Sequence, residues 1–220
     1  MGRIESFEVN AVKISVFLPD SYIPESTRRF PLLLMLNSGF KAHDSVAQLN
    51  CEGVLPEMVV AEIATAHESL TPDPIAILGA LNRRFRLLDS AFSRWIAGAA
   101  HHAIVAFQTV LDHPETFGAA MCFSTSFEGA EGAPPPHSPM LLHLEQRPIL
   151  PGSVYLYFDY GTIGLDECYE PYHRDLGAIL RHKNWFDGVE FVIVRNLGGS
   201  QTPSSITSRV ASALHWLASR

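Results

Sequence analysis

Apolar stretches alternate with longer amphipathic stretches along most of the chain. The first two, Arg3–Val9 and Val12–Leu18, alternate between apolar and polar residues, which is typical of strands with one exposed face. Later runs are continuously apolar, as strands buried on both faces require, and these are Phe30–Leu36, Met58–Ile63, Gly118–Phe123 and Val154–Phe158. Shorter strands are predicted at Arg94–Ala97 and Val189–Val194.

Helical spacing appears between these strands. The segment from Ile75 to about Phe92 repeats apolar residues on one face, and Asp73 followed by Pro74 supplies its N-cap and first turn. Further helices are predicted at His102–Leu111, Glu167–Lys183 and Ser204–Ala218, the last capped by Ser204 or Ser205. This alternation of strand and helix predicts a mostly parallel sheet with helices on both faces and an antiparallel hairpin at its start.

Ligands bind such sheets at the carboxyl ends of the strands. The segments expected there are Asn37–Gly39, Ala64–His67, Gly98–His102, Ser124–Phe127, Asp159–Asp166 and Gly198–Gln201. The loop Glu128–Pro139, rich in glycine and proline, is interpreted as an internal connection. Functional residues are therefore sought in the strand-end segments.

Composition narrows the classes of function. The 220 residues are 47% hydrophobic and 18% charged, which predicts a single globular domain over residues 1–220. A net charge of −7 argues against nucleic acid and against an anionic membrane surface as partners. Cys51, Cys122 and Cys168 lack metal-site spacing and are expected to be buried, unpaired thiols. With neither a long apolar run nor a signal-peptide pattern at the start, we expect a cytoplasmic protein.

Three segments carry a resemblance to a known family. They are Trp95–Ala103 with the following Asp112–Gly118, then Tyr157–Tyr172, and finally Gly198–Gln201 ahead of the last predicted helix. In this order they resemble an esterase family of α/β-hydrolases that includes enterochelin esterases and S-formylglutathione hydrolases. The resemblance runs from about Val12 to the end of the chain. It implies an α/β-hydrolase-type three-layer sandwich with a mostly parallel central sheet and an antiparallel N-terminal hairpin.

The resemblance also implies where a catalytic triad would lie. The family's G-x-S-x-G turn corresponds to residues 98–102, so that Ala100 takes the position of the nucleophilic serine. His102 takes the place of the second glycine, where its Cβ is expected to disfavour tight packing. Gln201 takes the position of the histidine and cannot act as a general base near neutral pH. Asp166 lies in the acid-bearing loop, although Ile163 stands where many members carry an acid. We therefore expect conventional serine hydrolysis to be lost.

His101 and Asp166 are the candidate catalytic base and acid. The alternatives are that His101 only fills volume and that Asp166 only begins a helix. The predicted ligand-binding residues are Asn37, Ser38, Gly39, His67, Ala100, His102, Ser124, Tyr160 and Gln201. In the family, the strand end corresponding to Asn37–Gly39 supplies the second oxyanion donor. Adjacent histidines on a helix point about 100° apart, so we predict no metal at this turn, and no cofactor.

Three functions are compatible with these residues. The first is binding of a small carbonyl-containing ligand, with a non-hydrolytic step such as isomerisation, epimerisation or cyclisation. The second is weak or unconventional carboxylester hydrolysis through Ser124, Ser126 or a histidine-activated water. The third is a non-catalytic binding protein. We expect an open pocket suited to a small molecule or to a peptide- or carrier-bound substrate, and a homodimer is left open.

Overall fold

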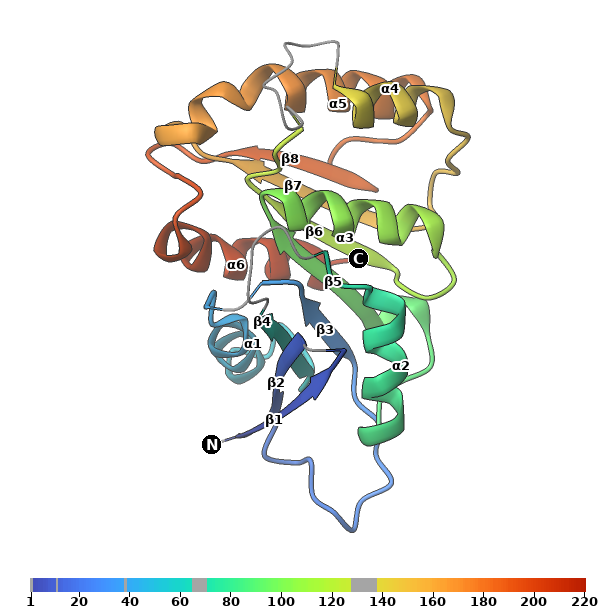
Figure 1. Cartoon of the computed structure of the whole chain (residues 1–220), viewed down its shortest axis with the longest axis vertical. Coiled ribbons are helices and arrows are strands. Elements are labelled where there is room, and N and C mark those ends of the chain that lie inside the picture. Colours follow the sequence, from blue (N-terminus) through green and yellow to red (C-terminus); the bar gives the residue numbers. More distant parts are fainter. Residues whose placement is uncertain (1, 11, 38, 65–70, 128–137) are drawn as a thin grey trace.

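The computed structural model describes residues 2–10, 12–37, 39–64, 71–127 and 138–220. Its strands form one eight-stranded sheet in the order β1-β2-β4-β3-β5-β6-β7-β8. In Figure 1 the sheet runs from β8 near the top of the molecule to the hairpin at the bottom. The strands are β1 Arg3–Val9, β2 Val12–Leu18, β3 Leu32–Met35, β4 Val59–Ala64, β5 Arg94–Ala99, β6 Ala119–Phe123, β7 Tyr155–Tyr160 and β8 Phe191–Arg195.

The register of the sheet confirms the predicted architecture. β1 and β2 form an antiparallel hairpin, and β2 also pairs antiparallel with β4. From β4 onward every neighbouring pair is parallel, so the carboxyl ends of these strands meet at one edge. The four residues of β3 are all buried, as expected of a strand covered on both faces.

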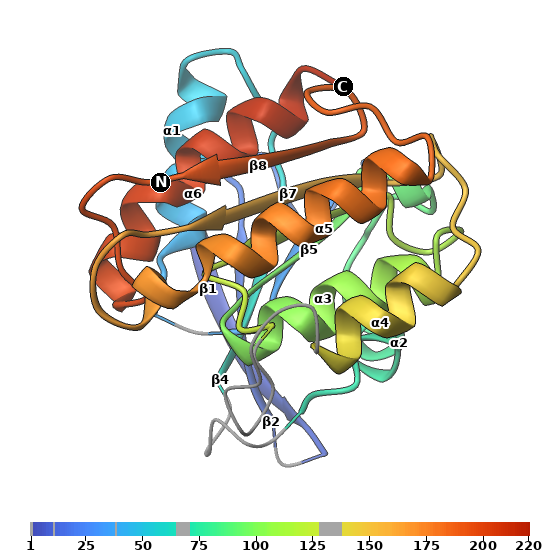
Figure 2. The same cartoon turned by 90° about the horizontal axis from the view of Figure 1, so that it is seen from above.

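Helices cover both faces of the sheet. They are α1 Ala42–Cys51, α2 Pro74–Arg84, α3 His101–Asp112, α4 Pro139–Gln146, α5 Glu170–His182 and α6 Pro203–Ala218. One hydrophobic core joins the sheet to α2, α3, α4 and α5, and a second joins its other face to α1 and α6. Figure 2 shows the sheet between these two layers, with α1 and α6 on the side opposite α3, α4 and α5. The result is the predicted three-layer sandwich.

Several predicted boundaries were wrong. The helix expected to reach Phe92 ends at Arg84, because the chain turns extended at Phe85 and Leu88 then donates a backbone hydrogen bond to Phe30. Helices α1 and α4 were not predicted, since each buries only a few side chains and repeats too weakly to be recognised. The segment Gly164–Cys168 is a 3₁₀ helix ahead of α5.

Two smaller predictions were also wrong. The N-cap of α6 is Thr202, without a side-chain capping bond, whereas Ser205 accepts a hydrogen bond from the backbone N–H of Ser200. Cys51 and Cys168 are exposed, and Cys122 alone of the three cysteines is buried. Asp73, by contrast, caps α2 as predicted, accepting from the N–H groups of Ile75 and Ala76. Within the described part of the chain, no helix combines the length and the apolar character that a membrane span requires.

Candidate functional site

A strained turn joins β5 to α3 at the carboxyl edge of the sheet. Ala100 connects them with φ 52° and ψ −120°, a conformation that glycine adopts far more readily than alanine. Its N–H donates to the carbonyl oxygen of Phe123 at 3.0 Å, and its own carbonyl accepts from the N–H of Ala103 at 3.2 Å. Backbone strain of this kind costs about 1–3 kcal/mol and persists only where the surrounding structure imposes it. The residue at the predicted nucleophile position is therefore an alanine on a strained strand-to-helix turn.

The close packing at this turn depends on Gly98. A Cβ at Gly98 would lie 2.3 Å from the carbonyl oxygen of His102, so β5 and the first turn of α3 approach too closely for any side chain there. The expectation that the Cβ of His102 would disfavour tight packing was wrong, because this side chain points into the protein and is only 3% exposed.

Asn37 makes hydrogen bonds on both sides of the turn, to His102 and to Ala99. The side-chain amide nitrogen of Asn37 lies 3.0 Å from Nδ1 of His102, and Oδ1 of Asn37 accepts from the backbone N–H of Ala99 at 2.9 Å. Two predicted ligand-binding residues are thus brought together, and their described contacts are with the protein. Gly39 follows with φ 91°, in open space. Ser38 and His67, also predicted to bind ligand, lie outside the described residues.

The rings of His101 and His102 lie 6.2 Å apart in an edge-on arrangement, and the two side chains differ in exposure. His101 is exposed and lines a cavity of about 570 Å³ between the start of α3 and α4. The cavity combines apolar and polar side chains, and its lining residues are His101, Ile104, Gln108, Ser126, Phe127, Pro139, Met140 and His143. The start of α3 also presents backbone N–H groups that have no carbonyl partner within the helix. His101, the residue that follows Ala100, thus lines a cavity of the size that small ligands occupy.

Asp166 lies elsewhere, in a buried polar network beyond the ends of β6 and β7. Its Oδ2 accepts from the hydroxyl of Ser124 at 2.6 Å and from the N–H of Gly161 at 2.7 Å. Its Oδ1 is buried and has no hydrogen-bond partner in the described part of the chain. Ser124 is fully buried, so this network brings Asp166 together with Ser124 but not with His101.

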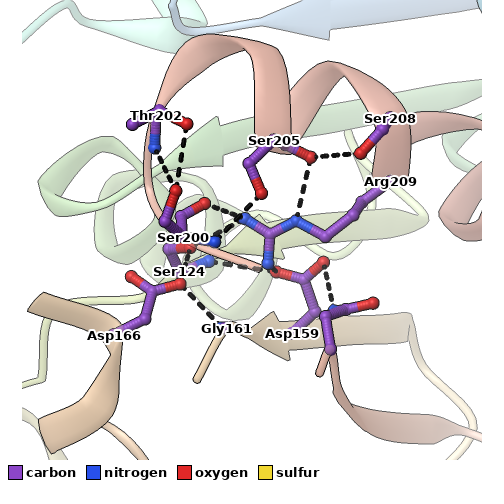
Figure 3. Close-up of polar contacts among 10 residues, drawn as sticks. Ser124, Asp159, Gly161, Asp166, Ser200, Thr202, Ser205, Ser208 and Arg209 are labelled. Atoms are coloured by element: carbon purple, nitrogen blue, oxygen red, sulfur yellow. Dashed lines mark hydrogen bonds and ion pairs between the residues drawn. The ribbon is translucent and has the colours of Figure 1, made fainter. Parts of the chain in front are cut away.

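Arg209 of α6 holds the network together (Figure 3). Its guanidinium donates to Oδ1 of Asp159 at 3.0 Å, to the hydroxyl of Ser124 at 3.0 Å and to the carbonyl of Ser200 at 2.8 Å. Burial raises the pKa of Asp159 to about 7, while Arg209 and the N–H of Ser124 act in the opposite direction. Asn196 donates a further hydrogen bond to Oδ2 of Asp159 at 3.2 Å. The network thus fixes the ends of β6 and β7 and the loop before α6.

The loop that carries Gln201 packs directly on the loop that carries Asp166. The carbonyl of Gly199 accepts from the N–H groups of Thr162 and Ile163, and a Cβ at Gly161 would lie 2.0 Å from that carbonyl oxygen. The same Cβ would lie 2.7 Å from Oδ2 of Asp166. Gln201 is half-buried two residues after Gly199. The loops that carry the acid position and the histidine position of the resemblance are therefore in contact.

Tyr160, another predicted ligand-binding residue, lines a different and smaller cavity. This cavity of about 210 Å³ also contains Thr162, Glu167 and Arg195. The ring of Tyr160 packs 4.7 Å from that of His173, which is fully buried. Burial lowers the pKa of His173 to about 4, so this side chain is neutral and belongs to the core. Among the described residues, no group of three or more His, Cys, Asp and Glu side chains is arranged to hold a metal ion.

Arg209 and Asp159 were missed by sequence reasoning, although a signal was present. Asp159 interrupts an otherwise apolar buried strand, and a buried carboxylate requires a partner. Arg209 lies three residues after Ile206 and just before Val210, on the buried stripe of α6. A charged residue on the apolar face of each of two elements is the pattern that predicts a buried ion pair.

Comparisons with known proteins bear on the fold. No family model matches the chain, and no curated protein matches it in sequence. Among solved structures, a ferulic acid esterase superposes with a TM-score of 0.77 at 15% identity, over 100% of this chain and 97% of the other. The ferric enterobactin esterase of Salmonella typhimurium gives 0.76 at 15% identity, over 99% of this chain but only 58% of the esterase. The S-formylglutathione hydrolase of Staphylococcus aureus gives 0.68 at 11% identity, over 99% and 98%.

The sequence identities are too low to assign the activity of these esterases to this chain. The superpositions do agree with the topology described above. The sheet order, the strained turn after β5 and the superposed esterase structures together show that this chain has the α/β-hydrolase fold.

Proposed function

We propose that this protein binds a small carbonyl-containing ligand at the turn formed by Ala100 and does not hydrolyse it by a serine mechanism. The observation that carries the proposal is the strained backbone of Ala100, which is retained beside a cavity of about 570 Å³. An alanine has no nucleophilic atom, so the strain does not serve nucleophilic attack. It does keep the first N–H groups of α3 directed to the carboxyl edge of the sheet, where a carbonyl or carboxylate oxygen accepts them.

The cavity suits a ligand with an apolar body and a polar end. Ile104, Phe127 and Met140 supply apolar surface, whereas His101 and His143 supply hydrogen-bonding groups. Any non-hydrolytic proton transfer on such a ligand would use His101, because it lines the cavity next to the turn. In this proposal Asp166 has a different role from the catalytic acid first expected, since its described contacts hold Ser124 and Gly161.

Weak ester hydrolysis is the second candidate, and one observation favours it. Ser126 and His101 line the same cavity, so a serine and a potential base are near the turn. Ser124 does not support this candidate, because its hydroxyl is fully buried and bonded to both Asp166 and Arg209. Slow ester turnover that disappears on Ser126→Ala substitution would favour this second candidate.

Ligand binding is tested by titrating a panel of short and aromatic carboxylates while the backbone amide signals are followed by NMR. We expect a bound carboxylate to shift the amide signals of His101 and His102, which begin α3. Ile104→Trp should abolish these shifts by filling the cavity. Ile75→Trp, on an exposed position of α2 outside the cavity, is the matched control and should leave them unchanged. Shifts that survive Ile104→Trp, or a panel in which no carboxylate shifts these amides, would contradict the proposal.

A further inference from the structure

Among the described residues, the strand β1 forms one edge of the sheet and pairs with β2 alone. Arg3, Ile4, Glu5 and Ser6 are all exposed. In an antiparallel pair, residues alternate between bonding to one neighbour and directing their N–H and C=O groups the other way. Val9 and Val12 face each other across a two-residue connection, so the odd-numbered residues bond to β2. The backbone groups of residues 2, 4, 6 and 8 are therefore directed to the open edge.

One face of this edge is apolar around Ile4. Ile4 is 58% exposed, and Phe17 is its cross-strand partner in β2. Both line a cavity of about 460 Å³ between the hairpin and α1, together with Val46 and Met58. An exposed isoleucine beside an apolar cavity at a free strand edge is the arrangement that β-strand pairing between chains uses.

The other face carries one positive and one negative charge. Arg3 and Glu5 lie two residues apart, so both point to the same side of the strand, and their charged groups are 3.1 Å apart. Arg3 also donates to the carbonyl of Tyr22 at 3.1 Å. This pair of opposite charges is symmetric about Ile4.

We propose that a second copy of this chain pairs with β1 in antiparallel fashion, with the two-fold axis at Ile4. In this register Ile4 faces Ile4 of the second copy, and each Arg3 faces a Glu5. Gly2 then faces Ser6, and the three outward-directed pairs form about six backbone hydrogen bonds. The apolar row of Phe17 and Ile4 continues across the axis into its symmetry equivalent. The two sheets become one, and this inference goes beyond the proposed ligand binding.

Charge selects this register over its neighbours. An axis at Glu5 would place the two copies of Glu5 opposite each other, and like charges directly opposite destabilise a strand pair. An axis at Ser6 would place Glu5 opposite Phe7 and Arg3 opposite Val9, which leaves both charges without a partner across the interface. The paired segment is short, so the dimer is expected to be weak and to form with rising protein concentration.

The test is the molar mass in solution, measured by sedimentation equilibrium over micromolar to millimolar protein. We expect concentration-dependent dimers whose association falls about tenfold or more in Arg3→Glu and in Glu5→Arg, because each change places like charges opposite one another. The double variant Arg3→Glu, Glu5→Arg exchanges the charges and should restore association. Glu8→Arg, on the same strand but outside the paired residues 2–6, is the control and should associate like the unmodified chain.

Cross-linking checks the register itself. In a Cys51→Ser, Cys168→Ser background, Ile4→Cys should form a disulfide-linked dimer on mild oxidation, because the two residues at position 4 face each other. Ser6→Cys should cross-link much less. A chain that stays monomeric throughout the concentration range, a double variant no better than the single ones, or preferential cross-linking at position 6 would overturn the proposal.

Discussion

Replacing Ala100 by glycine should stabilise this protein, which is the reverse of the usual effect of glycine near a helix. Ala100 adopts φ 52° and ψ −120°, and relieving such strain gains about 1–3 kcal/mol. Glycine loses more chain entropy on folding, at a cost of about 0.5–1 kcal/mol. Ala100 is only half-buried, so losing its methyl group removes little packing. The net expectation is that Ala100→Gly raises the free energy of unfolding by about 0.5–2 kcal/mol.

The assay is equilibrium unfolding in urea, with the midpoint compared at equal slope. Ala106→Gly is the matched control, because Ala106 is fully buried in the interior of α3 and should lose about 1 kcal/mol or more. If Ala100→Gly lowered stability as much as Ala106→Gly does, the turn would not be strained. The interpretation of residues 98–102 as a nucleophile elbow would then fail.

Two further predictions concern buried polar groups. Arg209→Leu leaves Asp159 buried without its cation and should lower the free energy of unfolding, measured by urea denaturation, by about 3–5 kcal/mol. The double variant Arg209→Leu, Asp159→Asn should recover part of this loss. Equal stability of the single and the double variant would contradict this. The pKa of His173 is about 4 in the folded protein and about 6.5 in an unfolded chain. The folded state therefore binds the proton of His173 less readily than the unfolded state. As a result, up to about 3 kcal/mol of stability is lost as pH falls from 6.5 towards 4. His173→Phe should remove this dependence, and the control His182→Phe, at an exposed position, should keep it. A stability difference between wild type and His173→Phe that does not change with pH would refute the assignment.

The sheet was predictable because its strands carry their own signal. The buried strands are uninterrupted apolar runs, and the hairpin alternates, so neither depends on distant partners for recognition. Helix α1 did not show this signal in the sequence. Its few apolar residues are recognisable as a buried stripe only in the structure, where they pack in the core shared with α6. The end of α2 was also misplaced, since the preference of residues 86–88 for pairing beside Phe30 is a tertiary effect.

The candidate site was predictable in part. The resemblance placed Ala100 on a strand-to-helix turn, and Ala100 does join β5 to α3. The packing of the loop of Gln201 on the loop of Asp166 is seen only in the structure. The resemblance could not show that Ser124 donates to Asp166 while Arg209 donates to Ser124 and Asp159, because these contacts join residues far apart in the chain. Nor could helical spacing alone show that His101 faces a cavity shared with α4, a helix that was not predicted.

The most direct test of the central claim is turnover of an activated short-chain aryl ester by the purified protein, beside an Ala100→Ser, Gln201→His double variant. Asp166 lies beside Gly161, which packs on Gly199 in the loop of residue 201. The buried Oδ1 of Asp166 has no hydrogen-bond partner in the described part of the chain, so we expect a histidine at position 201 to donate to this carboxylate. We predict that the unmodified protein is no faster than an inert protein control, and that the double variant gains turnover and a serine-linked acyl group. Any turnover by the unmodified protein above the control would contradict the proposed loss of hydrolysis, and Ser126→Ala would show whether Ser126 is responsible. A double variant with neither turnover nor acylation would contradict the assignment of Ala100 and Gln201 to the lost triad.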